Sequence, residues 1–183
     1  ANAALWRLYE IYKLAPSEAV EQEIAQLSQQ VYEQALRYEE EGSILEAMDN
    51  MRSVAQLSHM LDYDLQSGSG EPLSRRELWK NMSKLEDTPN YYSSLHERAQ
   101  AGLYSSSPEE QTRVFWDYAK LATQANDETL DADALKEEFL IASMNHLAYL
   151  RQQNRVGDVR SRMDMIRYVD SDMAADPRIA QYQ

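Results

Sequence analysis

Apolar side chains recur at steps of three and four residues along most of this chain, the spacing that gathers them on one face of an α-helix. The clearest run covers residues 18–40, where one face carries Ile24, Leu27, Val31, Ala35 and Tyr38. Ser17 precedes this run as an N-cap residue, and Gly42 follows it as a stop. No segment alternates apolar and polar residues between turn residues, so we predict no strand. The pattern predicts an all-α protein.

Start and stop signals divide the chain into seven to nine predicted helices. We expect them at about residues 3–14, 18–40, 44–65, 75–85, 90–102, 108–124, 131–153 and 156–168, and Pro177 opens a final turn or short helix. Ser43 with Glu46 and Ser74 with Glu77 each have the spacing of a capping box. Gly102 is expected to be the residue that ends its helix.

Two of these helix pairs carry the same spacing of apolar and turn residues, 112 positions apart. The first pair contains Ala35, Tyr38, Gly42, Ile44, Ala47, Met51 and Val54. The second contains, in the same order, Leu147, Leu150, Asn154, Val156, Val159, Met163 and Ile166. In each pair the turn residue, Gly42 or Asn154, separates two amphipathic runs. The match predicts two similar antiparallel helical hairpins.

The first pair resembles the tetratricopeptide repeat in the spacing of Ala35, Tyr38, Gly42, Ile44 and Ala47. The similarity is best over residues 24–65 and 140–168. Departures are the polar Gln34 and the larger Leu147 and Val159, and 112 is not a multiple of about 34, the length of that repeat. Two architectures therefore remain open, a tetratricopeptide-like stack of antiparallel hairpins and an irregular helical bundle.

The segment Ser67-Gly68-Ser69-Gly70 is the one low-complexity stretch in the sequence. Its strict alternation is typical both of a natural linker and of an engineered splice, so the chain is expected to consist of residues 1–66, a linker at 67–70 and residues 71–183. We expect the two helical segments to pack together as one domain.

The composition of the chain excludes several classes of function but does not indicate one. The chain has 31 acidic and 18 basic residues, a formal net charge of −13, and its mean hydropathy is −0.67. This balance disfavours nucleic acid as a partner, and no apolar run approaches the roughly 18 residues that insertion into a membrane requires. We expect a soluble protein, with the cytoplasm slightly favoured. The absence of cysteine excludes disulfides and thiol catalysis.

No residue pattern indicates catalysis, a metal or a cofactor. Each of the three histidines, His59, His96 and His146, stands alone in its predicted helix, without a second histidine three or four positions away. Neighbouring carboxylates such as Glu109 and Glu110 do not face each other on a helix. We therefore predict that the chain is not an enzyme and holds neither cofactor nor metal. A catalytic or metal-binding helical bundle is the third and weakest alternative.

The function that these features favour is a protein-interaction scaffold that holds a peptide or helix of a partner in a groove. The acidic surface favours a partner with a basic or helical segment. If the family resemblance holds, it implies that the first helix of each pair lines the groove, with contacts from Gln34, Arg37, Tyr38, Glu41, Asn145, Tyr149 and Gln152. The competing alternative is a structural subunit of a larger helical assembly, and the oligomeric state stays open.

Overall fold

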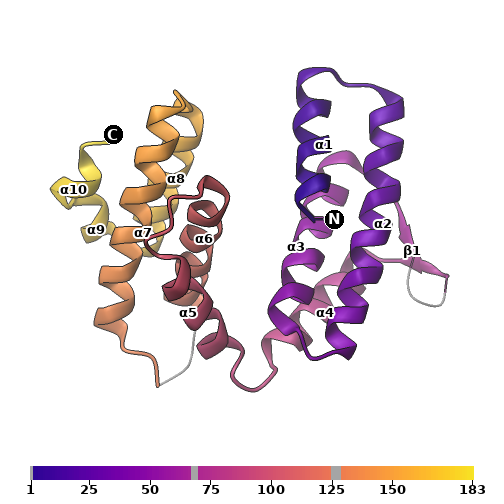
Figure 1. Ribbon diagram of the computed structural model, residues 1–183, viewed down its shortest axis with the longest axis horizontal. Coiled ribbons are helices and arrows are strands. Elements are labelled where there is room, and N and C mark those ends of the chain that lie inside the picture. The colour runs from indigo at the N-terminus through magenta and orange to yellow at the C-terminus, as the bar shows by residue number, and fades with distance from the viewer. Residues whose placement is uncertain (1, 67–69, 125–128) are drawn as a thin grey trace. The chain divides into compact units, whose positions relative to one another are not determined.

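The computed structural model describes residues 2–66, 70–124 and 129–183, and within these ranges the chain forms ten α-helices and one very short β-ladder (Figure 1). The prediction of an all-α fold is confirmed. Two compact units are present, Ala1–Tyr91 and Tyr92–Gln183. The division thus falls beyond the Ser-Gly segment, because the helix that follows this segment packs against a helix that precedes it. Residues 67–69 of that segment lie outside the described residues.

The first unit is built around an antiparallel helix pair. Its four helices are α1 (Asn2–Leu14), α2 (Glu18–Glu40), α3 (Ile44–Leu61) and α4 (Arg75–Glu86). The α1 and α3 helices pack against α2, and α4 packs against α3. The fully buried side chains include Leu5, Ile24, Val31, Ala35, Ala47, Met51, Val54 and Leu57. Most of them are apolar residues that the steps of three and four in the sequence place on one helix face.

Two-residue strands, β1 (Leu65–Gln66) and β2 (Pro72–Leu73), form the antiparallel ladder in the first unit. The prediction of no strand is wrong here, since two residues are too few to produce an alternating pattern. Gln29 on α2 completes the ladder's outer edge: its Oε1 accepts from the Gln66 backbone N–H at 2.8 Å, and its Nε2 donates to the Gln66 carbonyl at 3.0 Å. The α3 helix ends earlier than predicted because Asp62 adopts a left-handed conformation with φ of 52°.

The second unit contains the remaining helices. They are α5 (Tyr91–Gly102), whose first residue belongs to the first unit, α6 (Pro108–Gln124), α7 (Ala132–Gln152), α8 (Val156–Val169), α9 (Ser171–Ala175) and α10 (Pro177–Ala180). The α6 and α7 helices form the main pair, α8 packs against both, and the short α10 contacts α7. Phe115 and Phe139 meet edge to face in the core, with ring centroids 5.6 Å apart. The five-residue α9 was not predicted, because it is too short to show a helical period.

The turns of the two predicted hairpins have the same hydrogen bonds. In the α2–α3 turn, Gly42 N–H donates to the Glu39 carbonyl at 3.1 Å and Ser43 N–H to the Tyr38 carbonyl at 2.8 Å. In the α7–α8 turn, 112 positions later, Asn154 N–H donates to the Arg151 carbonyl at 3.0 Å and Arg155 N–H to the Leu150 carbonyl at 2.9 Å. Gly42 and Asn154 both have positive φ, 81° and 58°. Both turns are Schellman motifs, which confirms that the spacing match marks two equivalent turns.

Of the predicted helix-end motifs, one capping box is confirmed and the other is wrong. The Ser74–Glu77 capping box is confirmed, since each side chain bonds to the other residue's backbone N–H. The Ser43–Glu46 box is wrong, because the Ser43 side chain makes no cap hydrogen bond. Gly102 is not in the left-handed conformation expected of a helix-ending glycine. Instead, a Cβ there would lie 2.8 Å from both Glu110 Oε1 and Val114 Cγ2, so the glycine allows α5 and α6 to approach closely.

Within the described residues, no helix is both long enough and apolar enough to cross a lipid bilayer.

Candidate functional site

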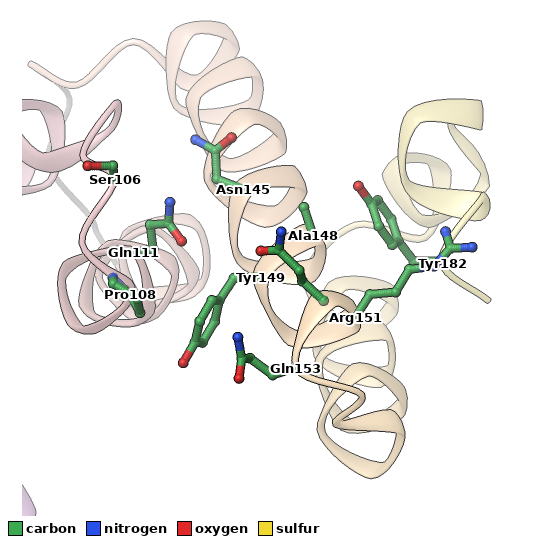
Figure 2. A pocket seen from close by; sticks show the side chains of 10 residues that line it. Ser106, Pro108, Gln111, Asn145, Ala148, Tyr149, Arg151, Gln153 and Tyr182 are labelled. Atoms are coloured by element: carbon green, nitrogen blue, oxygen red, sulfur yellow. The ribbon is translucent and has the colours of Figure 1, made fainter.

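An open hollow of about 700 Å³ lies on the second unit, between the start of α6, the C-terminal half of α7 and the C-terminal segment (Figure 2). Its lining is mostly polar and aromatic and consists of Ser106, Pro108, Gln111, Asn145, Ala148, Tyr149, Arg151, Gln152, Gln153 and Tyr182. Three of these, Asn145, Tyr149 and Gln152, are predicted site residues. The structure therefore brings all three predicted residues of the second hairpin to one hollow.

The loop between α5 and α6 forms one wall of the hollow because two amide side chains hold it. Asn145 on α7 donates from Nδ2 to the Leu103 carbonyl at 3.1 Å. Gln111 on α6 donates from Nε2 to the Ser105 carbonyl at 3.0 Å. Ser107 caps α6 by accepting from the Glu110 N–H at 3.4 Å. These bonds fix the loop against both helices, so the wall is tied to the helical framework.

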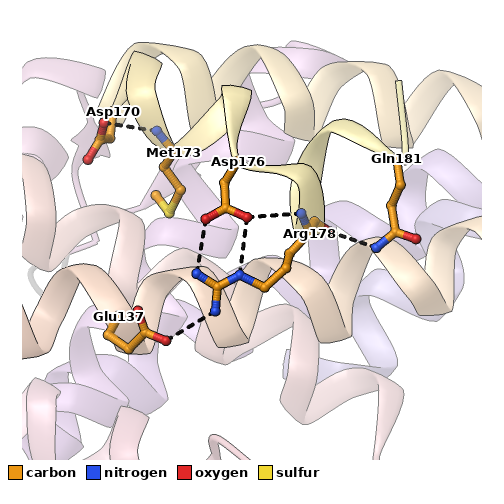
Figure 3. Close-up of polar contacts among 6 residues, drawn as sticks. All are labelled: Glu137, Asp170, Met173, Asp176, Arg178 and Gln181. Atoms are coloured by element: carbon orange, nitrogen blue, oxygen red, sulfur yellow. Dashed lines mark hydrogen bonds and ion pairs between the residues drawn. The ribbon is translucent and has the colours of Figure 1, made fainter.

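The opposite wall comes from the last residues of the chain, which ion pairs attach to α7. Figure 3 shows the central pair: Arg178 donates to both carboxylate oxygens of Asp176 and reaches Glu137 on α7 at 3.4 Å. Lys136 on α7 lies 2.9 Å from Asp170 at the start of α9. These attachments bring Tyr182 to the rim.

The lining carries a single formal charge, that of Arg151, whose guanidinium lies 5.7 Å from the centre of the Tyr182 ring. Carboxamides contribute four of the other lining side chains, those of Gln111, Asn145, Gln152 and Gln153. A carboxamide has both donors and an acceptor, so it can pair with either side of a peptide group. The hollow is thus equipped to hydrogen-bond a polar main chain and to stack against flat groups.

Elsewhere in the second unit, the buried Asp117 and the partly buried Glu138 join α5, α6 and α7 through polar contacts. Asp117 is 2% exposed and accepts two hydrogen bonds from Arg98, at 3.0 and 3.2 Å. Glu138 accepts from Gln100 at 2.9 Å and lies 2.7 Å from His96 Nε2. Burial alone would raise the pKa of Glu138, but these hydrogen bonds outweigh it and the pKa is lowered. Glu138 therefore stays ionised and the network is a structural tie.

A second buried group connects α8 to the rest of the unit. Arg162 donates from Nε to His146 Nε2 at 3.2 Å, and its guanidinium lies 4.7 Å from the centre of the Trp116 ring. Burial and the positive charge of Arg162 lower the pKa of His146 to about 4. Two other arginines of the α7–α8 hairpin form ion pairs three residues away, Arg155 with Asp158 at 2.6 Å and Arg167 with Asp164 at 2.8 Å. Both pairs lie within the second unit.

The four predicted site residues of the first hairpin lie in the first unit, and none of them lines the hollow. Gln34 donates to the Tyr38 hydroxyl at 3.2 Å and accepts from Asn50 on α3 at 3.5 Å. These two side chains thus contribute to packing between α2 and α3. Arg37 and Glu41 are exposed near the turn.

The sequence analysis did not predict the other lining residues as contacts, neither Ala148 and Arg151 on α7 nor those outside this helix. Ser106 lies between the helices predicted at 90–102 and 108–124, Pro108 begins the second of them, and Tyr182 lies near the end of the chain, after Pro177. The predicted helix ends located this loop in the sequence, but only the bond from Asn145 to Leu103 shows that it meets α7.

Among the described residues, no three histidine or acidic side chains are grouped in a way that could hold a metal ion. No protein-family model matches the chain, and neither a curated protein nor a solved structure shows significant similarity to it.

Proposed function

We propose that this chain is a non-enzymatic protein-interaction module, and that the hollow on the second unit holds a segment of a partner protein. The observation that carries the proposal is the convergence of Asn145, Tyr149 and Gln152 with the α5–α6 loop and Tyr182 around one hollow. Tyrosines supply rigid contact area, and carboxamides supply hydrogen bonds in both directions.

The charge distribution suggests how such a partner is oriented. Residues 92–183 contain 10 basic and 15 acidic residues, and this excess of acid favours basic residues in the parts of the partner that flank the hollow. Inside the hollow, the lone lining charge of Arg151 favours an uncharged polar or acidic group. We also propose that α2–α3 and α7–α8 are two versions of one tetratricopeptide-like hairpin, which the matched hydrogen bonds of the two turns support.

Affinity purification with quantitative mass spectrometry tests the hollow. The bait is the full chain, compared with a Tyr149→Ala, Gln152→Ala variant and with a control, Tyr168→Ala, which removes an exposed tyrosine that does not line the hollow. We expect the double variant to lose the partners that the wild type and the control retain. Equal recovery of the same proteins by all three baits would show that the hollow is not the binding site.

A second candidate, a structural subunit of a helical assembly, is favoured by apolar side chains exposed on α1. Leu14 is 88% exposed and Ile11, one turn earlier, is 50% exposed. Exposed apolar neighbours are typical of surfaces that another chain covers. Light scattering after gel filtration separates the candidates, because a subunit would self-associate and Leu14→Glu would reduce its mass to that of one chain. The interaction module is expected to be monomeric with or without that substitution.

A further inference from the structure

The solvent-facing side of α4 combines positive charge with an exposed tryptophan in an otherwise acidic unit. The α4 basic face, as we call it, consists of Arg75, Arg76, Lys80, Lys84 and Trp79. All five side chains are exposed, and Trp79 is 53% exposed. It lies in the first unit and shares no residue with the hollow, so it is independent of the proposed function above.

The geometry of α4 explains why these residues stay outside. Leu78, Met82 and Leu85 face the core at steps of three and four residues. Arg76, Lys80 and Lys84 follow one another at steps of four on the other side, where they form a row along the helix. Trp79 comes one turn after Arg75 and Arg76, so its ring is flanked by cations rather than covered by the core.

In the part of the chain that the structure describes, none of the four cations of the α4 basic face forms an ion pair or hydrogen bond through its side chain. The acidic residues nearby lie mainly at the helix ends: Glu77 bonds back to the Ser74 N–H at 3.4 Å, and Glu86 and Asp87 come at the C-terminal end. Four unpaired cations thus remain available for an outside group.

The charge of the rest of the unit limits what that outside group can be. Residues 1–91 contain 8 basic and 16 acidic residues, and outside the stretch 74–87 the numbers are 4 and 13. The row from Arg76 to Lys84 is about 12 Å long at 1.5 Å per residue. A bilayer surface or a nucleic-acid duplex extends well beyond this length and would meet the acidic remainder. A short acidic segment would meet only the cations.

We propose that the α4 basic face is a docking surface for a short acidic segment of a partner protein, with Trp79 as its apolar contact. Trp79 supplies the kind of aromatic anchor that dominates binding at interfaces. The acidic remainder of the unit repels the same segment elsewhere, so that charge fixes where it binds.

Fluorescence anisotropy tests this proposal by measuring the affinity of the full chain for an acidic peptide at low salt. The probe is a fluorescein-labelled peptide of eight residues, six glutamates interrupted by two leucines. We expect binding in the micromolar range, weakened about fivefold by Lys80→Gln with Lys84→Gln, because two exposed ion pairs are lost. The matched control, Arg113→Gln with Arg160→Gln, makes the same change in net charge on the second unit and should leave the affinity within about twofold.

A second variant separates the tryptophan from the charges. Trp79→Ala should weaken the probe about fivefold without changing its salt dependence, whereas Tyr168→Ala should have no effect. The proposal is overturned if the probe fails to bind, or if both charge variants weaken it equally. It is also overturned if duplex DNA or phosphatidylserine vesicles bind more tightly than the peptide and lose binding in the α4 variant, because a different polyanion is then the occupant.

Discussion

Acidification is expected to destabilise the second unit through His146. This side chain is 1% exposed, and its Nε2 accepts a hydrogen bond from Arg162 Nε. The ring proton of the neutral form therefore resides on Nδ1. A second proton would have to enter at Nε2, where it would break this bond and place two cations side by side. Burial and Arg162 accordingly lower the pKa of His146 from 6.5 to about 4.

The direction and size of the effect follow from proton linkage. Between pH 6.5 and 4 the unfolded chain binds a proton at this position and the folded unit does not, so the stability that depends on neutral His146 is lost as the pH falls. With these two pKa values, lowering the pH from 7 to 4.5 costs about 2 kcal/mol of unfolding free energy. This is a large share of the 5–15 kcal/mol typical of a domain.

Urea unfolding of the wild type and of His146→Gln, measured from pH 7 to 4.5, isolates this contribution. Glutamine can still accept from Arg162 but does not titrate, whereas the carboxylates titrate identically in both proteins. The chain has three tryptophans, so replacing Trp6 and Trp79 with phenylalanine leaves Trp116, beside Arg162, to report on the second unit. The free-energy difference between the two proteins should change by about 2 kcal/mol in favour of the variant.

Parallel pH curves for the two proteins would refute the reasoning. So would a proton NMR titration in which His146 titrates near 6.5 in the folded protein, because the buried contact with Arg162 would then not exist in solution.

Three further predictions test the packing. Gly42→Ala should cost about 1 kcal/mol in thermal unfolding because the position has positive φ, and Asn154→Ala should cost less because asparagine already bears part of that steric cost; a loss in neither variant would argue against left-handed turn residues. Asp117→Ala should cost about 2–3 kcal/mol because it removes the two charge-assisted hydrogen bonds between the buried Asp117 and Arg98, whereas Asp164→Ala, in an exposed pair, should cost less than about 1; similar losses would mean that the Arg98–Asp117 pair is solvated. Gly102→Ala should lower the unfolding free energy by about 1–3 kcal/mol through overpacking, and an unchanged melting temperature would contradict the close helix approach.

The longer helices could be predicted from the sequence because their apolar residues repeat over several turns. The α2 and α6 helices both have the predicted bounds. What the sequence did not reveal depends on few residues or on distant ones. The two-residue strands and α9 are too short to show a period. Gly102 ends α5 as predicted, but its contact with Glu110 on α6 is visible only in the structure.

The candidate site was predictable only on the helix that carries its motif. Asn145, Tyr149 and Gln152 lie on α7 outside its set of buried residues, and the hairpin pattern locates this helix. The residues facing them come from the α5–α6 loop and the end of the chain, and nothing local in the sequence links these segments to α7. Their positions depend on hydrogen bonds and ion pairs between distant residues, such as Arg178 with Glu137.

The two matched hairpins differ most informatively at one polar contact. Gln34 and Asn50 bond across the first hairpin, and the residues 112 positions later, His146 and Arg162, bond across the second with the donor again on the second helix. The contact keeps its geometry while its chemistry changes from two neutral amides to a titratable ring and a cation. Gln34 and Asn50 cannot gain a proton at moderate pH. His146 can, and when it is protonated its hydrogen bond with Arg162 is lost. A shared hairpin frame can therefore give two units different responses to acid, and the His146→Gln variant, which restores at this position the residue of the first hairpin, is the direct test of that difference.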